Sequence, residues 1–212
     1  MEPSRDGLRG GAHPLIGSDE IVQLRRGKFA GRLVIPFNSQ DEKKNFYNWV
    51  AFSDDAGATW KRGEKVPQSE TIQLNEVQVA EDRDGTLYLN SRRWKGAATR
   101  KVAWSKDGGA TWSQAVDDPT LPDPTCQGSL LRIDQGPTTR LYFLNPAGKG
   151  RKNGTLRVST DGGRTWSASR EAFPGPFAYS CMAALPDGRI GVLYEPGGDT
   201  VIKFRAVDPP GR

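Results

Sequence analysis

This 212-residue chain contains few histidines and cysteines, the residue types that most often bind metal ions or act in nucleophilic catalysis. The single histidine, His13, lies in a glycine-rich stretch near the N-terminus, which argues against a Ser-His-Asp triad and against a histidine-ligated metal. The two cysteines, Cys126 and Cys181, are too few for a disulfide framework. No segment is rich enough in carboxylates to form a calcium loop. We therefore expect no cofactor and no metal site.

Aspartates do recur at fixed spacing, within an eight-residue pattern, SxDxGxTW, that occurs three times. The copies occupy 53–60, 105–112 and 159–166, so their first serines are 52 residues apart (53 to 105) and then 54 (105 to 159). In a tight turn, Asp side chains bind nearby backbone amides and Gly supplies a positive φ. The Trp provides a large apolar anchor that is expected to pin the turn onto its own repeat. These aspartates are therefore predicted to shape hairpin tips rather than to take part in catalysis.

A second feature, a turn residue followed by an apolar strand, recurs at the same place in each period. It occurs at 31–36, 85–90, 139–144 and 188–193, and the first three copies precede their octads by 22, 20 and 20 residues. Units of about 50 residues, each with about four short strands, are typical of propeller blades. The sequence has no heptads and no long helical apolar face, so it predicts an all-β propeller with about four four-stranded blades.

Composition sets outer limits on the function. The net charge of +5 comes from scattered basic residues, which favours a solvated basic surface or an anionic ligand over nucleic acid. No apolar run approaches the ~20 residues of a membrane span. The N-terminus lacks the charged and apolar regions of a signal peptide, and the compartment stays open. Residues 1–18 are expected to be a loosely ordered leader, and 19–212 to form one propeller domain.

Motifs outside the octads resemble those of the bacterial exo-α-sialidases, whose Asp boxes, or BNR repeats, correspond to the octads. These motifs are 74–79 (LNEVQV), 90–92 (NSR), 121–129 (LPDPTCQGS), 151–153 (RKN) and 178–180 (AYS). The ordered set is more specific than the octads, which other propellers also carry. The resemblance runs from about residue 15 onward, but only to the later part of a six-bladed sialidase. It therefore implies a chain that is incomplete at its N-terminus.

The substrate of that family explains the residue types that the resemblance implies. A sialic acid carries a carboxylate on its anomeric carbon, which guanidinium groups bind as a fork. That carboxylate would repel a carboxylate nucleophile, and sialidases use a Tyr instead. Because an unperturbed Tyr has a pKa of about 10, it needs a neighbouring base. The resemblance implies Tyr179 as nucleophile, Glu76 as its base, and Arg92 and Arg151 as ligands of the carboxylate of a sialylated glycan.

For each of the two arginine assignments, another arginine of the sequence is an alternative candidate. Arg93 is adjacent to Arg92, and the NSR context favours Arg92. Arg151 is preferred to Arg157 because it precedes Asn153 in the RxN pattern, whereas Arg157 falls within the strand before the third octad.

The other site residues also have a purely structural interpretation. Glu76 could be an exposed carboxylate at a strand edge, and Tyr179 a core tyrosine with a bonded hydroxyl. The neighbouring prolines and glycine (174–176) place Tyr179 at a loop-to-strand entry, where site residues often lie. Cys126 and Gln127 either line the pocket or pack in the core.

Two functional groups of the family have no recognisable counterpart. Arg32 resembles the early arginine of an RIP-type motif, but it shares its place in the repeat with residues 86, 140 and 189 and is expected to be a turn residue. Asp19 and Asp41 lack the context of the acid/base Asp. Loss of a general acid costs ~10²–10⁴ in rate. The sequence thus leaves two functions open: an exo-α-sialidase, or a non-catalytic propeller fragment that binds sialylated glycans or a complementing chain. In either case Glu76, Arg92, Arg151 and Tyr179 are predicted to converge at one end of the ring axis.

Overall fold

The computed structural model describes residues 15–16, 21–197 and 201–211, and over these ranges it contains strands and one short 3₁₀ turn, η2 (Gly27–Phe29). The predicted leader lies outside the described residues except for two that form a short strand, and His13 and Asp19 lie outside them as well. Among the described residues, no helix has the length and apolar character needed to cross a bilayer.

The strands form four antiparallel sheets that succeed one another along the chain. Blade 1 contains β1 (Leu15–Ile16), β2 (Val22–Gln23), β3 (Leu33–Gln40), β4 (Phe46–Ser53) and β5 (Lys61–Arg62). Blade 2 contains β6 (Gln73–Glu81), β7 (Leu87–Lys95), β8 (Thr99–Ser105) and β9 (Val116–Pro122). Blade 3 contains β10 (Ser129–Gln135), β11 (Thr138–Pro146), β12 (Lys152–Ser159) and β13 (Ala168–Pro176), and blade 4 contains β14 (Ser180–Ala184), β15 (Ile190–Tyr194) and β16 (Lys203–Val207).

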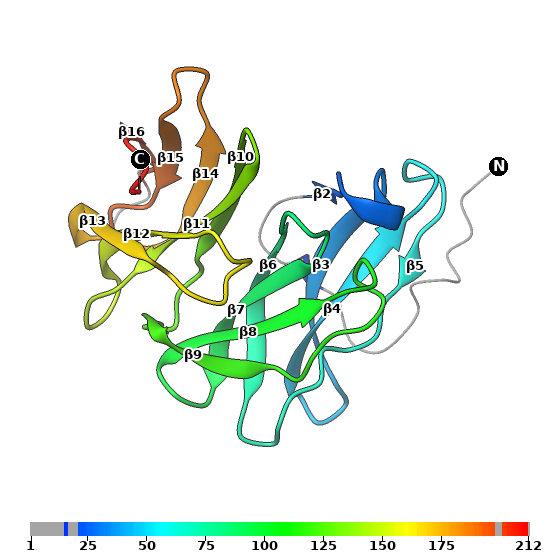
Figure 1. Ribbon diagram of the computed structural model, residues 1–212. Coiled ribbons are helices and arrows are strands. Elements are labelled where there is room, and N and C mark those ends of the chain that lie inside the picture. The colour runs from blue at the N-terminus through cyan, green and yellow to red at the C-terminus, as the bar shows by residue number, and fades with distance from the viewer. Residues whose placement is uncertain (1–14, 17–20, 198–200, 212) are drawn as a thin grey trace.

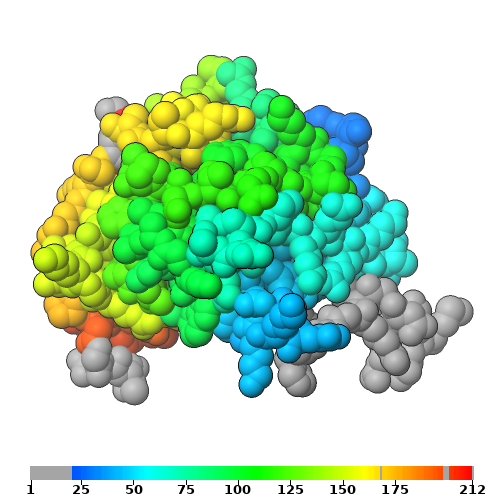
Figure 2. All heavy atoms as spheres, turned by 90° about the horizontal axis from the view of Figure 1, so that it is seen from below, coloured from blue at the N-terminus to red at the C-terminus, as the bar shows by residue number. Residues whose placement is uncertain are grey.

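The blades follow one another in space as they do in sequence, which confirms the predicted all-β, four-bladed propeller arrangement (Figure 1). In the view from below, blade 1 is blue to cyan on one side and blade 3 is yellow on the other, with the green blade 2 between them (Figure 2). The first strands of the later blades lie side by side, since β6 contacts β10 and β10 contacts β14. Residues at the beginnings of these strands are therefore brought to one end of the propeller.

Each octad forms the turn between two neighbouring strands of its blade: β4 and β5 in blade 1, β8 and β9 in blade 2, and β12 and β13 in blade 3. In the first copy the Ser53 hydroxyl oxygen accepts a hydrogen bond from the Gly57 amide (2.8 Å), and the Asp55 carboxylate accepts one from the Thr59 amide (2.8 Å) and one from its hydroxyl (2.6 Å). The same bonds recur in the other two copies. The bonds from Thr59 lower the pKa of Asp55 to about 2. The octad aspartates are thus part of the turns, as predicted.

The octad tryptophans do more than pin their own turns. Trp60 donates to the carbonyl of Gly57 in its own octad (3.1 Å), as expected. Trp166 of blade 3, however, packs against Tyr88 of blade 2, with ring centroids 6.0 Å apart. Trp166 also contacts Phe143 of its own blade, so it anchors its own repeat as expected and in addition joins two blades.

Apolar clusters fill the spaces between successive blades. Val50 of blade 1 packs in one cluster with Leu89 of blade 2, and Leu156 of blade 3 packs in another with Val192 of blade 4. Because both faces of the middle strands are covered, their buried residues form continuous runs rather than an alternation; β4 is buried from Tyr47 to Ser53. This stacking fixes the relative positions of the blades and hence of the site residues that they carry.

Candidate active site

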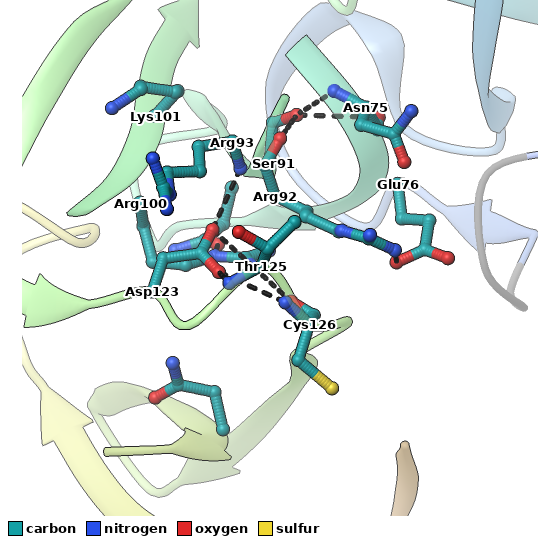
Figure 3. A network of polar contacts seen from close by, with 12 residues as sticks. Asn75, Glu76, Ser91, Arg92, Arg93, Arg100, Lys101, Asp123, Thr125 and Cys126 are labelled. Carbon is teal, nitrogen blue, oxygen red and sulfur yellow. Dashed lines mark hydrogen bonds and ion pairs between the residues drawn. The ribbon is translucent and has the colours of Figure 1, made fainter. Parts of the chain in front are cut away.

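A β-bulge in β6 presents Glu76. Leu74 pairs with Arg93 and Val77 pairs with Ser91, so two residues of β6 lie opposite one residue, Arg92, of β7. A bulge of this kind breaks the two-residue alternation of a strand and re-aims the side chains within it. Here the bulge turns Glu76 toward Arg92, which lies opposite it in β7 (Figure 3).

Side chains from the neighbouring strands hold the bulged backbone in place. The amide of Asn75 donates to the Ser91 hydroxyl oxygen (3.1 Å), and its carbonyl accepts from the side chain of Asn48 in blade 1 (2.7 Å). Both Asn75 and Ser91 are buried. The geometry of Glu76 is therefore set by a fixed backbone and not only by its own rotamer.

Three of the predicted site residues form a closed set of hydrogen bonds. Arg92 Nη1 donates to Glu76 Oε2 (2.8 Å) and to the phenolic oxygen of Tyr179 (3.1 Å). The Tyr179 hydroxyl in turn donates to Glu76 Oε1. Tyr179 comes from the segment between β13 and β14, 103 residues beyond Glu76. The phenol, the carboxylate and one guanidinium thus meet although the segment before β14, the strand β6 and the strand β7 supply them.

The phenol of Tyr179 is protonated in this arrangement. Burial, followed by the hydrogen bond and the negative charge of Glu76, raises the pKa of Tyr179 to about 12, and the nearby Arg92 opposes the rise. Burial lowers the pKa of Arg92, but the hydrogen bond and charge of Glu76 outweigh it and the pKa is raised. The acceptor already in place for the phenolic proton is therefore Glu76.

Arg151 lies beside the same phenol, in the connection between β11 and β12. Its guanidinium carbon is 5.4 Å from the centre of the Tyr179 ring, and Nη2 donates to the carbonyl of Thr125 (3.2 Å). Its own carbonyl accepts from the amide of Phe177, two residues before the tyrosine (3.0 Å). The four predicted residues are therefore brought together at one end of the propeller.

The two competing arginines are directed elsewhere. Arg93 donates to the carbonyl of Gly96 within the β7–β8 hairpin (3.1 Å). Arg157 is buried inside blade 3, where it donates to Asn145 Oδ1 (2.9 Å), and burial lowers its pKa to about 10. Neither guanidinium has a hydrogen bond to Glu76 or Tyr179 among those described.

Gln127 and Cys126 are both buried, and Gln127 also lines the hollow beside Tyr179. Gln127 is buried and forms two hydrogen bonds with the backbone of Ser180, accepting from its amide and donating to its carbonyl (3.0 Å each). These bonds fix the residue next to Tyr179. Cys126 is fully buried, and burial raises the pKa of its thiol to about 11, so the thiol stays neutral. Neither cysteine forms a disulfide within the part of the chain that the structure describes, and Cys181 is half-buried.

Glu195 was not predicted from sequence and lies next to Tyr179. The backbones of the two residues are bonded, with the Glu195 amide donating to the Tyr179 carbonyl (2.9 Å), and Glu195 Oε2 accepts from the Tyr179 amide (3.5 Å). The pairing of β14 with β15 across a turn could have suggested this neighbour from sequence. Glu195 and Tyr179 border a hollow of about 290 Å³, whose other lining residues are Gln127, Ser180, Cys181, Leu193, Tyr194 and Ile202.

Arg32 and Asp41 both have structural partners, and for Arg32 this agrees with the predicted role in a turn. Arg32 forms a two-pronged ion pair with Asp54 (2.7 and 3.1 Å) and donates to the carbonyl of Gly108 in the next blade (3.1 Å). Asp41 closes the turn between β3 and β4 by accepting from the amide of Asn45 (2.8 Å). Over the part of the chain that the structure describes, no three His, Cys, Asp or Glu side chains group as metal ligands.

The fold and these turns define the class of the protein, an Asp-box β-propeller. A family model described as "BNR repeat-like domain" matches residues 15–192, and the chain belongs to this family, in its sialidase branch. A sialidase of Micromonospora viridifaciens is 40% identical over 187 residues, covering 85% of this chain and 28% of the relative. A sialidase of Bacteroides fragilis is 34% identical over 174 residues, covering 78% and 31%.

Solved structures agree with this assignment. Hadza microbial sialidase Hz136 superposes with a TM-score of 0.76 and 29% identity, over 92% of this chain and 38% of that one. An intramolecular trans-sialidase from Ruminococcus gnavus has a TM-score of 0.71 and 26% identity, over 92% and 44%. The chain therefore spans less than half the length of each of these four relatives.

Proposed function

We propose that this chain carries the nucleophile half of a retaining exo-α-sialidase site, with Tyr179 as nucleophile, Glu76 as its base, and Arg92 and Arg151 as ligands of the substrate carboxylate. The observation that carries the proposal is the Tyr179 hydroxyl donating to Glu76 while Arg92 contacts both. The three side chains lie within direct hydrogen-bond reach of one another, which supports the proposed roles because an activated nucleophile requires a base at that distance.

The proton balance of the first step follows from these contacts. As the Tyr179 oxygen bonds to the anomeric carbon, its proton passes to Glu76 and the bond to the leaving oxygen breaks. A water oxygen then bonds to the anomeric carbon, the sialyl–tyrosine bond breaks, and the proton returns from Glu76 to the phenol. The proton that the water gives up goes to the base that remained after the leaving oxygen was protonated, so the two steps together consume one water and release no net proton. The leaving oxygen takes its proton from water or from an acid that the residues assigned here do not supply. Turnover slower by ~10²–10⁴ than with a positioned acid is therefore expected.

The electrostatics explain why a phenol suits this position. The substrate carboxylate adjoins the reacting carbon, so a carboxylate nucleophile would be repelled whereas a neutral phenol is not. Arg92 and Arg151 both approach Tyr179, at 3.1 Å from its oxygen and 5.4 Å from its ring centre. The related R. gnavus structure was solved with oseltamivir carboxylate, which supports an acidic ligand for this family.

Hydrolysis of a fluorogenic sialoside tests the proposal directly. The parent chain is expected to release the fluorophore, and Tyr179→Phe, which removes only the nucleophilic oxygen, is expected to abolish release. Tyr194→Phe is a matched control, because Tyr194 borders the same hollow but has no assigned role. Equal rates for Tyr179→Phe and the parent would overturn the nucleophile assignment.

The second candidate is a propeller that binds sialylated glycans without turnover or that pairs with a chain supplying further blades. It is motivated by the leaving-group acid, a role that none of the four assigned residues fills. Calorimetry with N-acetylneuraminic acid distinguishes the two: binding that is lost in Arg151→Ala, with no hydrolysis by the parent, would support this candidate.

A further inference from the structure

A buried carboxylate lies behind the site and accepts four hydrogen bonds. Asp123 is 1% exposed and belongs to the connection between β9 and β10. Its Oδ1 accepts from the amides of Thr125 (2.8 Å) and Cys126 (3.1 Å). Its Oδ2 accepts from the amide of Arg93 (2.7 Å) and from Arg100 Nη1 (3.2 Å). Figure 3 shows these donors gathered around the one carboxylate, next to Arg92.

The bond to Arg93 fixes the backbone from which Arg92 extends. The ladder between β7 and β8 ends where Ser91 pairs with Lys101, so β8 offers the Arg93 amide no partner. Asp123 supplies that partner instead. The backbone of β7 is thereby held at Arg93, immediately beside Arg92, whose guanidinium contacts Glu76.

The other bonds of Asp123 shape the loop on which Arg151 rests. Thr125 has a φ of 62°, a left-handed conformation that a residue with a branched side chain rarely adopts unless it is held. The Asp123 carboxylate stabilises this conformation by accepting a hydrogen bond from the Thr125 amide. The Thr125 carbonyl in turn accepts a hydrogen bond from Arg151 Nη2 (3.2 Å). The same carboxylate therefore reaches both arginines through backbone groups.

Arg100 balances the charge of this carboxylate and ties it to the core. Arg100 is 1% exposed and also donates to Asn90 Oδ1 (2.7 Å) and to the carbonyl of Cys126 (2.7 Å). In some proteins a buried ion pair of this kind contributes to a unique geometry more than to stability, and the proposal below assigns that role to this pair. Because the pair is neutral as a unit, Asp123 does not cancel the positive field of the neighbouring arginines.

We propose that the Asp123–Arg100 ion pair is a positioning device, which sets the distance between the Arg92 and Arg151 guanidiniums so that both reach one ligand carboxylate. The proposal rests on the function proposed above, since it is that function which needs two guanidiniums on one carboxylate. Neither Asp123 nor Arg100 contacts Glu76 or Tyr179 by a described hydrogen bond, so their effect passes through the two arginines.

Asp123→Asn is the test variant, with Glu81→Gln as its matched control. The amide nitrogen of Asn cannot accept, so two of the four donors lose their acceptor. Glu81 is an equally buried carboxylate at the last residue of β6, at the end of that strand away from Glu76. It accepts hydrogen bonds from the amides of Arg25 and Arg26 (2.9 Å each) and forms an ion pair with Arg132. The two variants should therefore perturb folding similarly, but only Asp123→Asn should disturb the site.

The first readout needs no ligand: the ¹⁵N and ¹³C guanidinium NMR signals of Arg92 and Arg151, assigned through Arg92→Lys and Arg151→Lys. We expect both signals to shift in Asp123→Asn and to stay in place in Glu81→Gln. Unshifted signals in Asp123→Asn, or equal shifts in both variants, would overturn the positioning role. If Asp123→Asn does not fold, Arg100→Gln/Asp123→Asn leaves no unpaired buried charge, and the same expectations apply to it.

The second readout is the affinity for N-acetylneuraminic acid, measured by calorimetry on the folded variants. Loss of one charge-assisted hydrogen bond to the carboxylate predicts binding weaker by about tenfold in Asp123→Asn and unchanged in Glu81→Gln. If the parent does not bind the sugar but the guanidinium signals shift as expected, the proposed function fails while the positioning role stands. Shifted signals with unchanged affinity would overturn the link between the ion pair and the ligand.

Discussion

Replacing Glu76 with Gln should make the phenol of Tyr179 a stronger acid. Glu76 raises the pKa of Tyr179 in two ways, by accepting its proton in a hydrogen bond and by its negative charge. Gln removes the charge and keeps a similar shape. Burial, the largest contribution, remains, so the pKa of Tyr179 in Glu76→Gln is expected to lie between the ordinary 10.0 and the about 12 of the parent.

The size of the effect follows from the parent value. At pH 10.5 a phenol with a pKa of about 12 is ionised to about 3%, and each unit by which the pKa falls raises the ratio of tyrosinate to phenol tenfold. The signal can be isolated from the four other tyrosines by subtracting the absorbance of the same chain with Tyr179→Phe. The comparison is therefore between two difference spectra, one in the parent background and one in Glu76→Gln.

A larger tyrosinate signal in the Glu76→Gln background at pH 10.5 would support the argument. The wavelength and amplitude of full ionisation can be calibrated on each chain unfolded in guanidinium chloride, where all phenols titrate normally. A signal equal to or smaller than that of the parent would refute the reasoning, because it would mean that the carboxylate does not control the proton of Tyr179 and cannot be its base.

Three further predictions concern the octad turns and can be measured by urea and thermal unfolding. Gly163→Ala should lower the free energy of unfolding by about 2–5 kcal/mol, because its φ is +80° and a Cβ there would lie 2.6 Å from the Tyr88 ring. Gly57→Ala should lower it by only about 1–2 kcal/mol, because no atom lies nearer than 3.7 Å to the added Cβ. Equal losses in the two variants would contradict this prediction. Ala56 has a φ of 57°, so Ala56→Gly should stabilise by about 0.5–1 kcal/mol, and a loss of stability would show that the turn is not strained. The pKa of Asp55 is depressed from 3.8 to about 2, so the stability that its carboxylate contributes is present above pH 3.8 and is lost as the pH falls through about 2. The midpoint of thermal unfolding should therefore fall less over this pH range in Asp55→Asn than in the parent. Parallel curves for the two chains would refute this prediction.

The turns and blades could be predicted from the sequence because their chemistry is local. In an octad such as 53–60, the Asp, Gly and Thr that form the turn lie within a few residues of one another, so their spacing is visible in the chain. Three copies at nearly equal spacing were then sufficient to predict a propeller of about four blades. What the octad cannot show is that Trp166 packs on Tyr88 in the preceding blade, since that contact spans 78 residues (88 to 166).

The residue types of the site also came from sequence, through motifs that resemble those of sialidases, but their geometry depended on the tertiary structure. Period-two alternation alone leaves Arg92 and Arg93 as equal candidates. The bulge in β6, which sets two residues against one, directs Arg92 to Glu76 and Tyr179. The partners of Asp123 likewise could not be predicted from the sequence. Its hydrogen bonds to Arg93 and Arg100 join residues that are 30 and 23 positions apart, and only the packing of strands and loops brings them within hydrogen-bond distance. The turns and the chemical groups can be read from the chain because they depend on residues that are close in sequence. Which of these groups meet depends on the packing of strands and loops that are far apart in sequence.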